Sequence, residues 1–401
     1  MGRTKTKTRS TRLMSSSAPE APPHASISPK GAGKRAKKPA PTIEALIAKA
    51  QELVVQCDYD LARQFVDRVL EREGGNVEAR ELKGVVEMES GDVDIAKEIF
   101  LSLVPPSSTA PVPAPPSAHL YLAQLYSDDD ARAALQHYQT AVSALLAKMG
   151  SKGKEEVDKT SDMLEEEEGE MKKMVVRACC SMVDIWMTDL CFEPEAEASC
   201  EEILRQALGT DPDNTEALLS LASVRMSQQR PDDAEQCVRK VWSMWEEIAA
   251  DSPSHPTPPT LLSFARLCLE LELFDLALSS ISRTLEMDDT EVEAWYLEGW
   301  CFWLMSQGDE VRKPWEDMTK EDMLRDARDC LDTCLMLHTN QQHPDEQLLQ
   351  HVQELLRELE ALGVHATPPD EEATLGNAEE DDEWVDDDEE LDDEDEDVEM
   401  S

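Results

Sequence analysis

The sequence predicts an all-α fold in which antiparallel helix pairs stack side by side into a solenoid. Small residues recur at a period of about 34 residues, as in the pairs Ala50 and Gly84 or Ala265 and Gly299. Inside a repeat, a second small residue follows on the partner helix, as Ala62 follows Ala50. This period, with small residues where two helices cross, is typical of stacked helix-pair repeats. Such an array presents its surface to a polypeptide, so the sequence predicts a binding protein.

The period is that of tetratricopeptide repeats, and about seven helix pairs can be placed along the chain. The first pair spans 43–76 and the second spans 77–104. Six prolines over 105–116 then predict a linker, because proline lacks the amide hydrogen that a helix needs. The third pair begins near Ser117. Residues 150–170 are charged and contain glycine, so we expect a mobile loop or a frayed helix end there.

The next three pairs follow with a clear boundary between the fourth and the fifth. The fourth pair covers about 171–212, with a long turn between its helices near Phe192. It closes on Asp-Pro-Asp-Asn at 211–214, where proline stops the helix and the acidic and amide side chains serve the turn. The fifth pair spans 213–250 and the sixth about 258–291, and a cluster of four prolines breaks the chain between them.

The seventh pair opens with Trp295 and Gly299 in the family's positions, but its second helix arrives later than the repeat requires. Residues 307–320 are therefore interpreted as an insertion. Pro344 starts a final amphipathic helix with a single apolar stripe, and we expect this helix to cap the exposed end of the stack. The stripe consists of Leu348, Val352, Leu355, Leu356 and Leu359.

Charge divides the chain into three parts. Residues 1–40 contain ten Lys or Arg and one Glu, whereas 370–401 contain twenty Asp or Glu and no Lys or Arg. Of the total net charge of −48, about −37 therefore belongs to 41–369. We expect a disordered basic segment over 1–40, a solenoid over 41–365 and a disordered acidic tail over 366–401.

The charge of the solenoid restricts its partners. A negative field repels nucleic acid, whose binding depends on neutralising phosphates with Lys and Arg. The same field attracts a very basic protein and steers it in at long range. The alternative is that the acidity only keeps the chain soluble, although the charge is larger than solubility needs.

No segment carries a recognisable catalytic constellation. Phosphate-binding glycine loops and the HExxH zinc motif are missing, and the many solvated carboxylates single out no acid–base pair. Cys330, Cys334 and His338 share one helix face, but without the usual zinc spacings we interpret them as a packing stripe. We expect no enzyme activity, no cofactor and no metal. Ten cysteines without a CxxC pair, and no secretory signal or membrane span, indicate free thiols in a reducing compartment.

In tetratricopeptide repeats, the first helix of each pair lines the binding groove, and its small residue is position 8. That family implies that positions 2, 5, 9, 12 and 13 face the groove. The resulting mixture of carboxylates, methionines and rings suits an extended peptide whose Lys and Arg stems lie on aromatic faces. Trp300 and Trp303 are also open to a second interpretation, packing against the neighbouring repeat. The candidates are Glu81, Val85, Met88, Glu89, Glu216, Leu219, Ser223, Met226, Glu293, Tyr296, Trp300 and Trp303.

The same positions argue against the commonest role of this fold, capture of the C-terminal carboxylate of a heat-shock chaperone. That role needs Lys at position 5 and Asn at position 9. Position 5 holds Ile47, Glu81, Leu120, Leu219, Leu262 or Tyr296, and position 9 holds Gln51, Val85, Gln124, Ser223, Arg266 or Trp300. A groove of this composition repels a carboxylate.

The organisation of 43–401 resembles the fungal dedicated assembly chaperones of ribosomal protein L-four. The resemblance rests on the basic N-terminus, the interrupted repeats, the negative groove and the tail with its Asp-Asp-Glu-Trp-Val-Asp-Asp run at 381–387. It implies that the partner is a basic protein client, the extended Lys- and Arg-rich loop of a newly made ribosomal protein. The solenoid of that family shields the loop from aggregation and stray RNA, travels with it to the nucleus and releases it at the pre-ribosome.

The Lys-Arg-Ala-Lys-Lys run at 34–38 resembles a nuclear localisation patch, and a plain solubilising tail is its alternative. We expect a monomer in cytoplasm and nucleus that binds a nuclear import receptor as a further partner and contacts neither nucleic acid nor membrane directly. Two other functions stay open. One is a histone-type chaperone, which the acidic tail fits equally well, and the other is a scaffold subunit of a larger complex.

Overall fold

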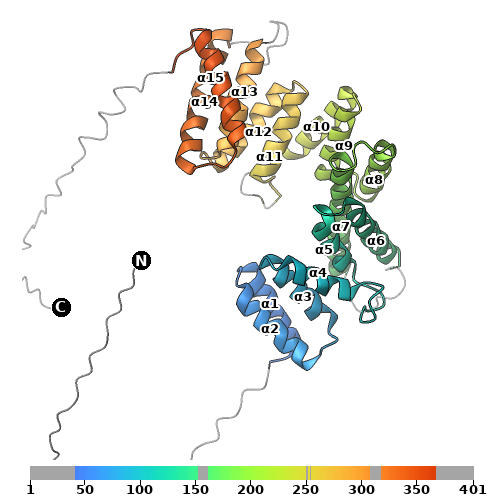
Figure 1. Ribbon diagram of the computed structural model, residues 1–401. Helices are drawn as coiled ribbons and strands as arrows, with labels where there is room; N and C mark the ends of the chain where they lie inside the picture. Colours follow the sequence, from blue (N-terminus) through green and yellow to red (C-terminus); the bar gives the residue numbers. More distant parts are fainter. Residues whose placement is uncertain (1–40, 152–160, 250–251, 253, 308–317, 367–401) are drawn as a thin grey trace, which may run out of the picture. The chain divides into compact units, whose positions relative to one another are not determined.

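In a computed structural model of the chain, the structure describes residues 41–151, 161–249, 252, 254–307 and 318–366. Within these ranges all regular secondary structure is helical, and fifteen helices follow one another along the chain (Figure 1). The predicted all-α fold class is confirmed. The predicted basic segment and the acidic tail from residue 367 onward lie outside the described residues.

The chain divides into two units, and the first ends at Ala79. It holds one complete helix pair, α1 (Ile43–Val55) and α2 (Tyr59–Arg72). Thr42 and Asp58 cap the two helices, because each side chain accepts a hydrogen bond from a backbone amide in the first turn. The apolar stripes predicted from the sequence are buried against each other. They consist of Leu46, Ala50 and Leu53 on α1 and Ala62, Val66 and Val69 on α2.

The second unit begins at Arg80, inside α3 (Val77–Glu89), and continues the repeats. Each first helix contacts the second helix of its pair from α5 and α6 to α13 and α14, and α7 also contacts α9 while α11 contacts α13. The helices are α4 (Val93–Leu103), α5 (Pro116–Ser127), α6 (Ala131–Ser151), α7 (Ser161–Met187), α8 (Ala196–Thr210), α9 (Thr215–Ser227), α10 (Pro231–Trp245), α11 (Pro258–Glu270), α12 (Phe274–Met287), α13 (Val292–Gln307), α14 (Lys320–Gln341) and α15 (Glu346–Ala361).

The two glycines that defined the period lie where the two helices of one pair are in close contact. A Cβ atom on Gly84 would lie 2.6 Å from the ring of Phe100 on α4. A Cβ atom on Gly299 would lie 2.8 Å from the side chain of Leu331 and 3.1 Å from the carbonyl oxygen of Ala327 on α14. A side chain at either position would force its neighbours on the partner helix to shift, which explains why small residues recur at these crossings.

The structure corrects the prediction for 150–170. The α6 helix continues to Ser151 and α7 already begins at Ser161, well before the expected start at 171, while 152–160 lie outside the described residues. The charges that suggested a loop instead form ion pairs at helical spacing. Lys172 lies 2.8 Å from Glu168, and Lys173 lies 2.8 Å from Glu170.

The final helix buries its predicted stripe. Asp345 caps α15 by accepting hydrogen bonds from two backbone amides of the first turn, and all five apolar side chains of the stripe are buried. The helix packs on α14, where Arg328 is 8% exposed and contacts Asp332 at 2.7 Å and Glu360 on α15 at 3.4 Å. The ion pairs and the apolar stripe together hold α15 on the last pair.

The stripe of Cys330, Cys334 and His338 packs in the protein interior, as predicted. The Cys334 thiol donates to the Val292 carbonyl oxygen at 3.4 Å, and Nε2 of His338 lies 2.9 Å from the Asp345 carbonyl oxygen. All ten cysteines are free thiols and seven of them are buried. None of the described helices combines the length and apolar character that crossing a bilayer requires.

Candidate functional site

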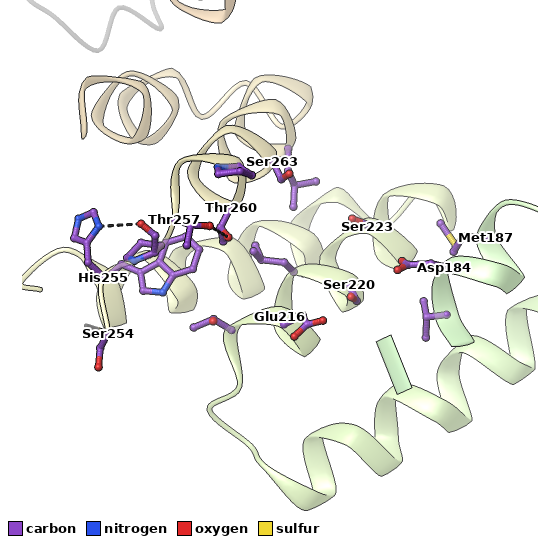
Figure 2. Close-up of a pocket in the computed structure, with 17 residues that line it drawn as sticks. Asp184, Met187, Glu216, Ser220, Ser223, Ser254, His255, Thr257, Thr260 and Ser263 are labelled. Carbon is purple, nitrogen blue, oxygen red and sulfur yellow. Dashed lines mark hydrogen bonds between the residues drawn. The ribbon is translucent and has the colours of Figure 1, made fainter. Parts of the chain in front are cut away.

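A hollow of about 690 Å³ opens between α7, α9 and α11 in the second unit (Figure 2), and we call it the central hollow. Each of these helices is the first of its pair. In Figure 2 the labelled residues of α9 lie between those of α7 on one side and the start of α11 on the other. The lining residues are Val183, Asp184 and Met187 from α7, Thr215, Glu216, Leu219, Ser220 and Ser223 from α9, Pro259, Thr260, Ser263 and Leu267 from α11, and Trp245 and 254–257.

Local sequence signals position α9, the middle one of the three helices that line the hollow. The Asn214 side chain caps α9 by accepting a hydrogen bond from the Ala217 amide at 3.1 Å, so the predicted turn at 211–214 starts the helix. One face of α9 is buried through Ala217, Leu218 and Ala222, all at most 5% exposed. The opposite face, which carries Glu216, is therefore left for the hollow.

Two carboxylates give the central hollow its charge. Burial raises the pKa of the Asp184 carboxyl above its ordinary value. Burial also raises the pKa of Glu216, the negative charge of Asp184 adds to the rise, and the positive charge of Arg177 offsets part of it. Glu216 is nevertheless solvent-exposed, as expected of a group on the wall of a hollow. A carboxylate with incomplete hydration and a like-charged neighbour binds a Lys or Arg side chain favourably.

Two smaller hollows are also lined by first helices of the pairs. A hollow of about 500 Å³ shares Met187, Ser223 and Leu267 with the central hollow and adds Met226 and Arg266. Another, of about 230 Å³, lies between α5, α6 and α7 and has two tyrosines and an arginine in its wall. The three hollows are lined largely by first helices of consecutive pairs, with methionines and small hydroxyl side chains among the charged groups.

Known proteins match this chain over most of its length. Residues 196–243, which form α8, α9 and most of α10, match the family model for a tetratricopeptide repeat. A Schizosaccharomyces pombe protein named "Probable assembly chaperone of rpl4" is 30% identical over 325 residues, which is 80% of this chain and 91% of that protein. The chain belongs to the rpl4 assembly chaperone family.

Two further members agree with this assignment. An Emericella nidulans protein with the same name is 28% identical over 354 residues, which is 84% of this chain and 87% of that protein. The solved structure of the assembly chaperone of RpL4 (Acl4) is 26% identical, superposes with a TM-score of 0.59 and covers 66% of this chain and 97% of its own. The match therefore covers most of the length of each of these three proteins as compared.

The predicted residues of the fifth pair come together in the hollows. Glu216 and Leu219 line the central hollow, Ser223 lines both larger hollows, and Met226 lines the second one. These four positions carry over from the tetratricopeptide pattern because α9 keeps the regular repeat, with Ala222 buried at its crossing with α10.

The predicted residues of the second pair lie elsewhere, on α3. Val85 and Met88 are partly exposed, and Glu89 is exposed. Glu81 and Glu89 are close enough to Tyr121 on α5 that, after burial, their charges are the next largest cause of its raised pKa. Glu81 and Glu89 occupy positions on a first helix that are predicted to face the groove, but they do not line the central hollow.

The predicted residues of the seventh pair are already engaged with other side chains. Glu293 pairs with Arg266, whose Nε lies 2.6 Å from a carboxylate oxygen of Glu293. The Tyr296 hydroxyl lies 2.7 Å from Nδ1 of His351 on the capping helix α15, and Tyr296 stacks on Trp300 at 5.8 Å. These rings therefore bridge α13 and α15.

Trp303 is partly buried, like the other candidates of this pair. Its indole nitrogen is buried and has no hydrogen-bond partner among the described residues. It packs, partly buried, against the core cluster of α14 and α15, as Trp300 also does. Both tryptophans therefore contribute to packing, and their role toward a partner stays a prediction.

The sequence reasoning missed the contribution of α7. The first half of the fourth pair departs from the regular repeat, so no groove positions were assigned to it. Its signal is polar side chains within a helix that is otherwise buried. Arg177, Ser181 and Asp184 recur at helical spacing, whereas Cys180 and Val183 beside them are buried. Polar residues at helical spacing on an otherwise apolar helix therefore indicate this wall even where the repeat pattern is irregular.

Proposed function

We propose that this chain is an assembly chaperone for the ribosomal protein rpl4. The observation that carries the proposal is the match over 91% of the S. pombe relative, which bears that name. The central hollow supports the same conclusion from chemistry. Its two carboxylates have raised pKa values and lie on the surface that such repeats use for extended peptides.

The client enters the hollow as an extended basic segment. Its Lys or Arg head binds between Asp184 and Glu216, and the aliphatic stem lies on Met187 and Leu219. The hydroxyl groups in the wall supply hydrogen bonds to the client backbone. Electrostatic attraction reaches only about 8 Å at physiological salt, so the contacts in the hollow determine specificity while the acidic tail increases the capture rate.

The chaperone acts by binding alone and performs no catalysis. It occupies the basic segment while that segment is unfolded, and the acidic side chains replace the phosphates that later surround it. Ribosomal RNA then releases the client by competing for the same cations. In this proposal the monomeric chaperone moves with its client from cytoplasm to nucleus with an import receptor, and it contacts no nucleic acid or membrane.

The test is binding of the purified full-length chain to purified rpl4 at moderate salt, with core histones as the competing basic protein. We expect rpl4 to bind and an excess of histones to leave the complex intact. Equal binding of histones would replace the proposal with a general histone-type chaperone. Recovery from cells of several neutral proteins without rpl4 would replace it with a scaffold.

A further inference from the structure

One contact recurs between the first helices of consecutive pairs. The residue just after the small residue of one pair reaches a glutamate in the first turn of the next pair's first helix. In the first unit, Nε2 of Gln51 lies 3.4 Å from Oε1 of Glu78. In the second unit, Nε of Arg266 lies 2.6 Å from Oε1 of Glu293. The sequence separation is the same in both, but a neutral amide holds one glutamate and a full positive charge holds the other.

The Arg266–Glu293 pair lies beside the proposed binding surface. Arg266 lines the hollow of about 500 Å³ together with Met226 and Glu270. Its side chain is 47% exposed and that of Glu293 is 26% exposed, so solvent and a client can reach the pair. Arg266 is also within 3.4 Å of the Ser263 hydroxyl, which holds the guanidinium on the same side of α11.

We propose that Arg266 is a selectivity residue that masks Glu293 and so confines client cations to the central hollow. This inference rests on the proposed function. Glu293 occupies a position that faces the client in this repeat family, yet its charge is already neutralised from inside the chain. In the wall of the second hollow Arg266 also stands together with Glu270, so these two charged residues leave the wall without a net negative charge. A client Lys or Arg is therefore attracted more strongly to Asp184 and Glu216 in the central hollow.

Replacing Arg266 by a client Lys or Arg as the partner of Glu293 changes the free energy little. An exposed ion pair contributes only about 0.2–1 kcal/mol, so removal of Arg266 leaves folding almost unchanged. The same removal frees Glu293 for a client cation and leaves Glu270 as the charged group in the wall of the second hollow. Arg266→Gln is the sharpest substitution, because glutamine is the residue that already makes the equivalent contact at Gln51.

The test measures the affinity of fluorescently labelled rpl4 for four forms of the full-length chain. These are the unchanged chain, Arg266→Gln, Glu293→Gln and the double variant. We expect Arg266→Gln to bind about two- to fivefold more tightly, from the value of one exposed charge contact. Glu293→Gln alone should change affinity less than twofold, and its addition to Arg266→Gln should cancel most of the gain.

Arg239→Gln is the matched control. Arg239 pairs with Glu235 at 2.7 Å on α10, a second helix, and is 50% exposed. Its substitution changes the net charge by the same amount and should leave rpl4 affinity unchanged. Weaker or unchanged binding by Arg266→Gln, equal gains from both arginine variants, or a thermal melt showing that Arg266→Gln is unfolded would overturn the inference. Failure of the unchanged chain to bind rpl4 would overturn the proposed function instead.

Discussion

Substitution of the two acids in the central hollow should weaken the binding of rpl4 without lowering the stability of the fold. Asp184→Asn together with Glu216→Gln keeps the side-chain volumes and removes two negative charges. Each carboxylate that receives a client cation contributes about 0.5–1.5 kcal/mol, since the site is partly solvated. The double variant should therefore lose about 1–3 kcal/mol of binding free energy, or roughly 5- to 150-fold in Kd.

The stability of the same variant should not fall. Burial raises the pKa of both carboxyls, and the charge of Asp184 raises that of Glu216 further, which means that the folded state holds their negative charge at a cost. The amides remove this cost, so the midpoint of thermal unfolding should stay the same or rise. Binding is measured by fluorescence anisotropy of labelled rpl4 at moderate salt, and unfolding is followed by circular dichroism.

The control removes one charge from α12, the second helix of its pair, and one from the capping helix α15, neither of which lines the central hollow. Glu286→Gln on α12 with Glu358→Gln on α15 changes two exposed glutamates and the same net charge. Equal losses of affinity in both double variants would show that only the overall field matters and would refute a role for the central hollow. A drop in the unfolding midpoint of Asp184→Asn/Glu216→Gln would show that these acids stabilise the fold.

Three more outcomes follow from the structure. The raised pKa values of Asp184 and Glu216 imply that the affinity for rpl4 increases with pH above about 4.3, the ordinary glutamate value, because the client binds the ionised carboxylates. When Kd is measured against pH, the Asp184→Asn/Glu216→Gln variant should lose this dependence. Gly299→Ala should lower stability by about 1–3 kcal/mol in denaturant melts, because its Cβ would meet Leu331, whereas Gly209→Ala on α8, with open space around it, should not destabilise. Deletion of 370–401 should slow association in stopped-flow mixing and leave the complex formed, and complete loss of binding would place the site in the tail.

The sequence predicted the fold well where small residues mark helix crossings. Gly84 and Gly299 define the period because a larger residue there would force its neighbours on the partner helix to shift. The apolar stripe of α15 can be recognised from the spacing of its residues in the sequence. The start of α7 was not predictable in this way. Its acidic first turns look like a loop until the lysines one turn later are considered as ion-pair partners.

The candidate site was only partly predictable for a related reason. Glu216 follows from the regular register of α9, but Asp184 lies on a helix that departs from the repeat. The sequence also carries no sign that Glu293 is engaged, because its partner Arg266 is distant in the sequence and lies on another helix. Charge composition predicts the sign of the surface, whereas pairing within the chain decides which acids remain for a client.

The walls of the central hollow belong to three successive repeats, and none of the three encloses it alone. The helices of these repeats pack through buried residues such as Ala222 and Ala265, whereas the exposed wall residues Asp184 and Glu216 lie outside that packing. Client preference can therefore change through one wall at a time during evolution, by exchange of a few exposed residues, without any need to rebuild the scaffold.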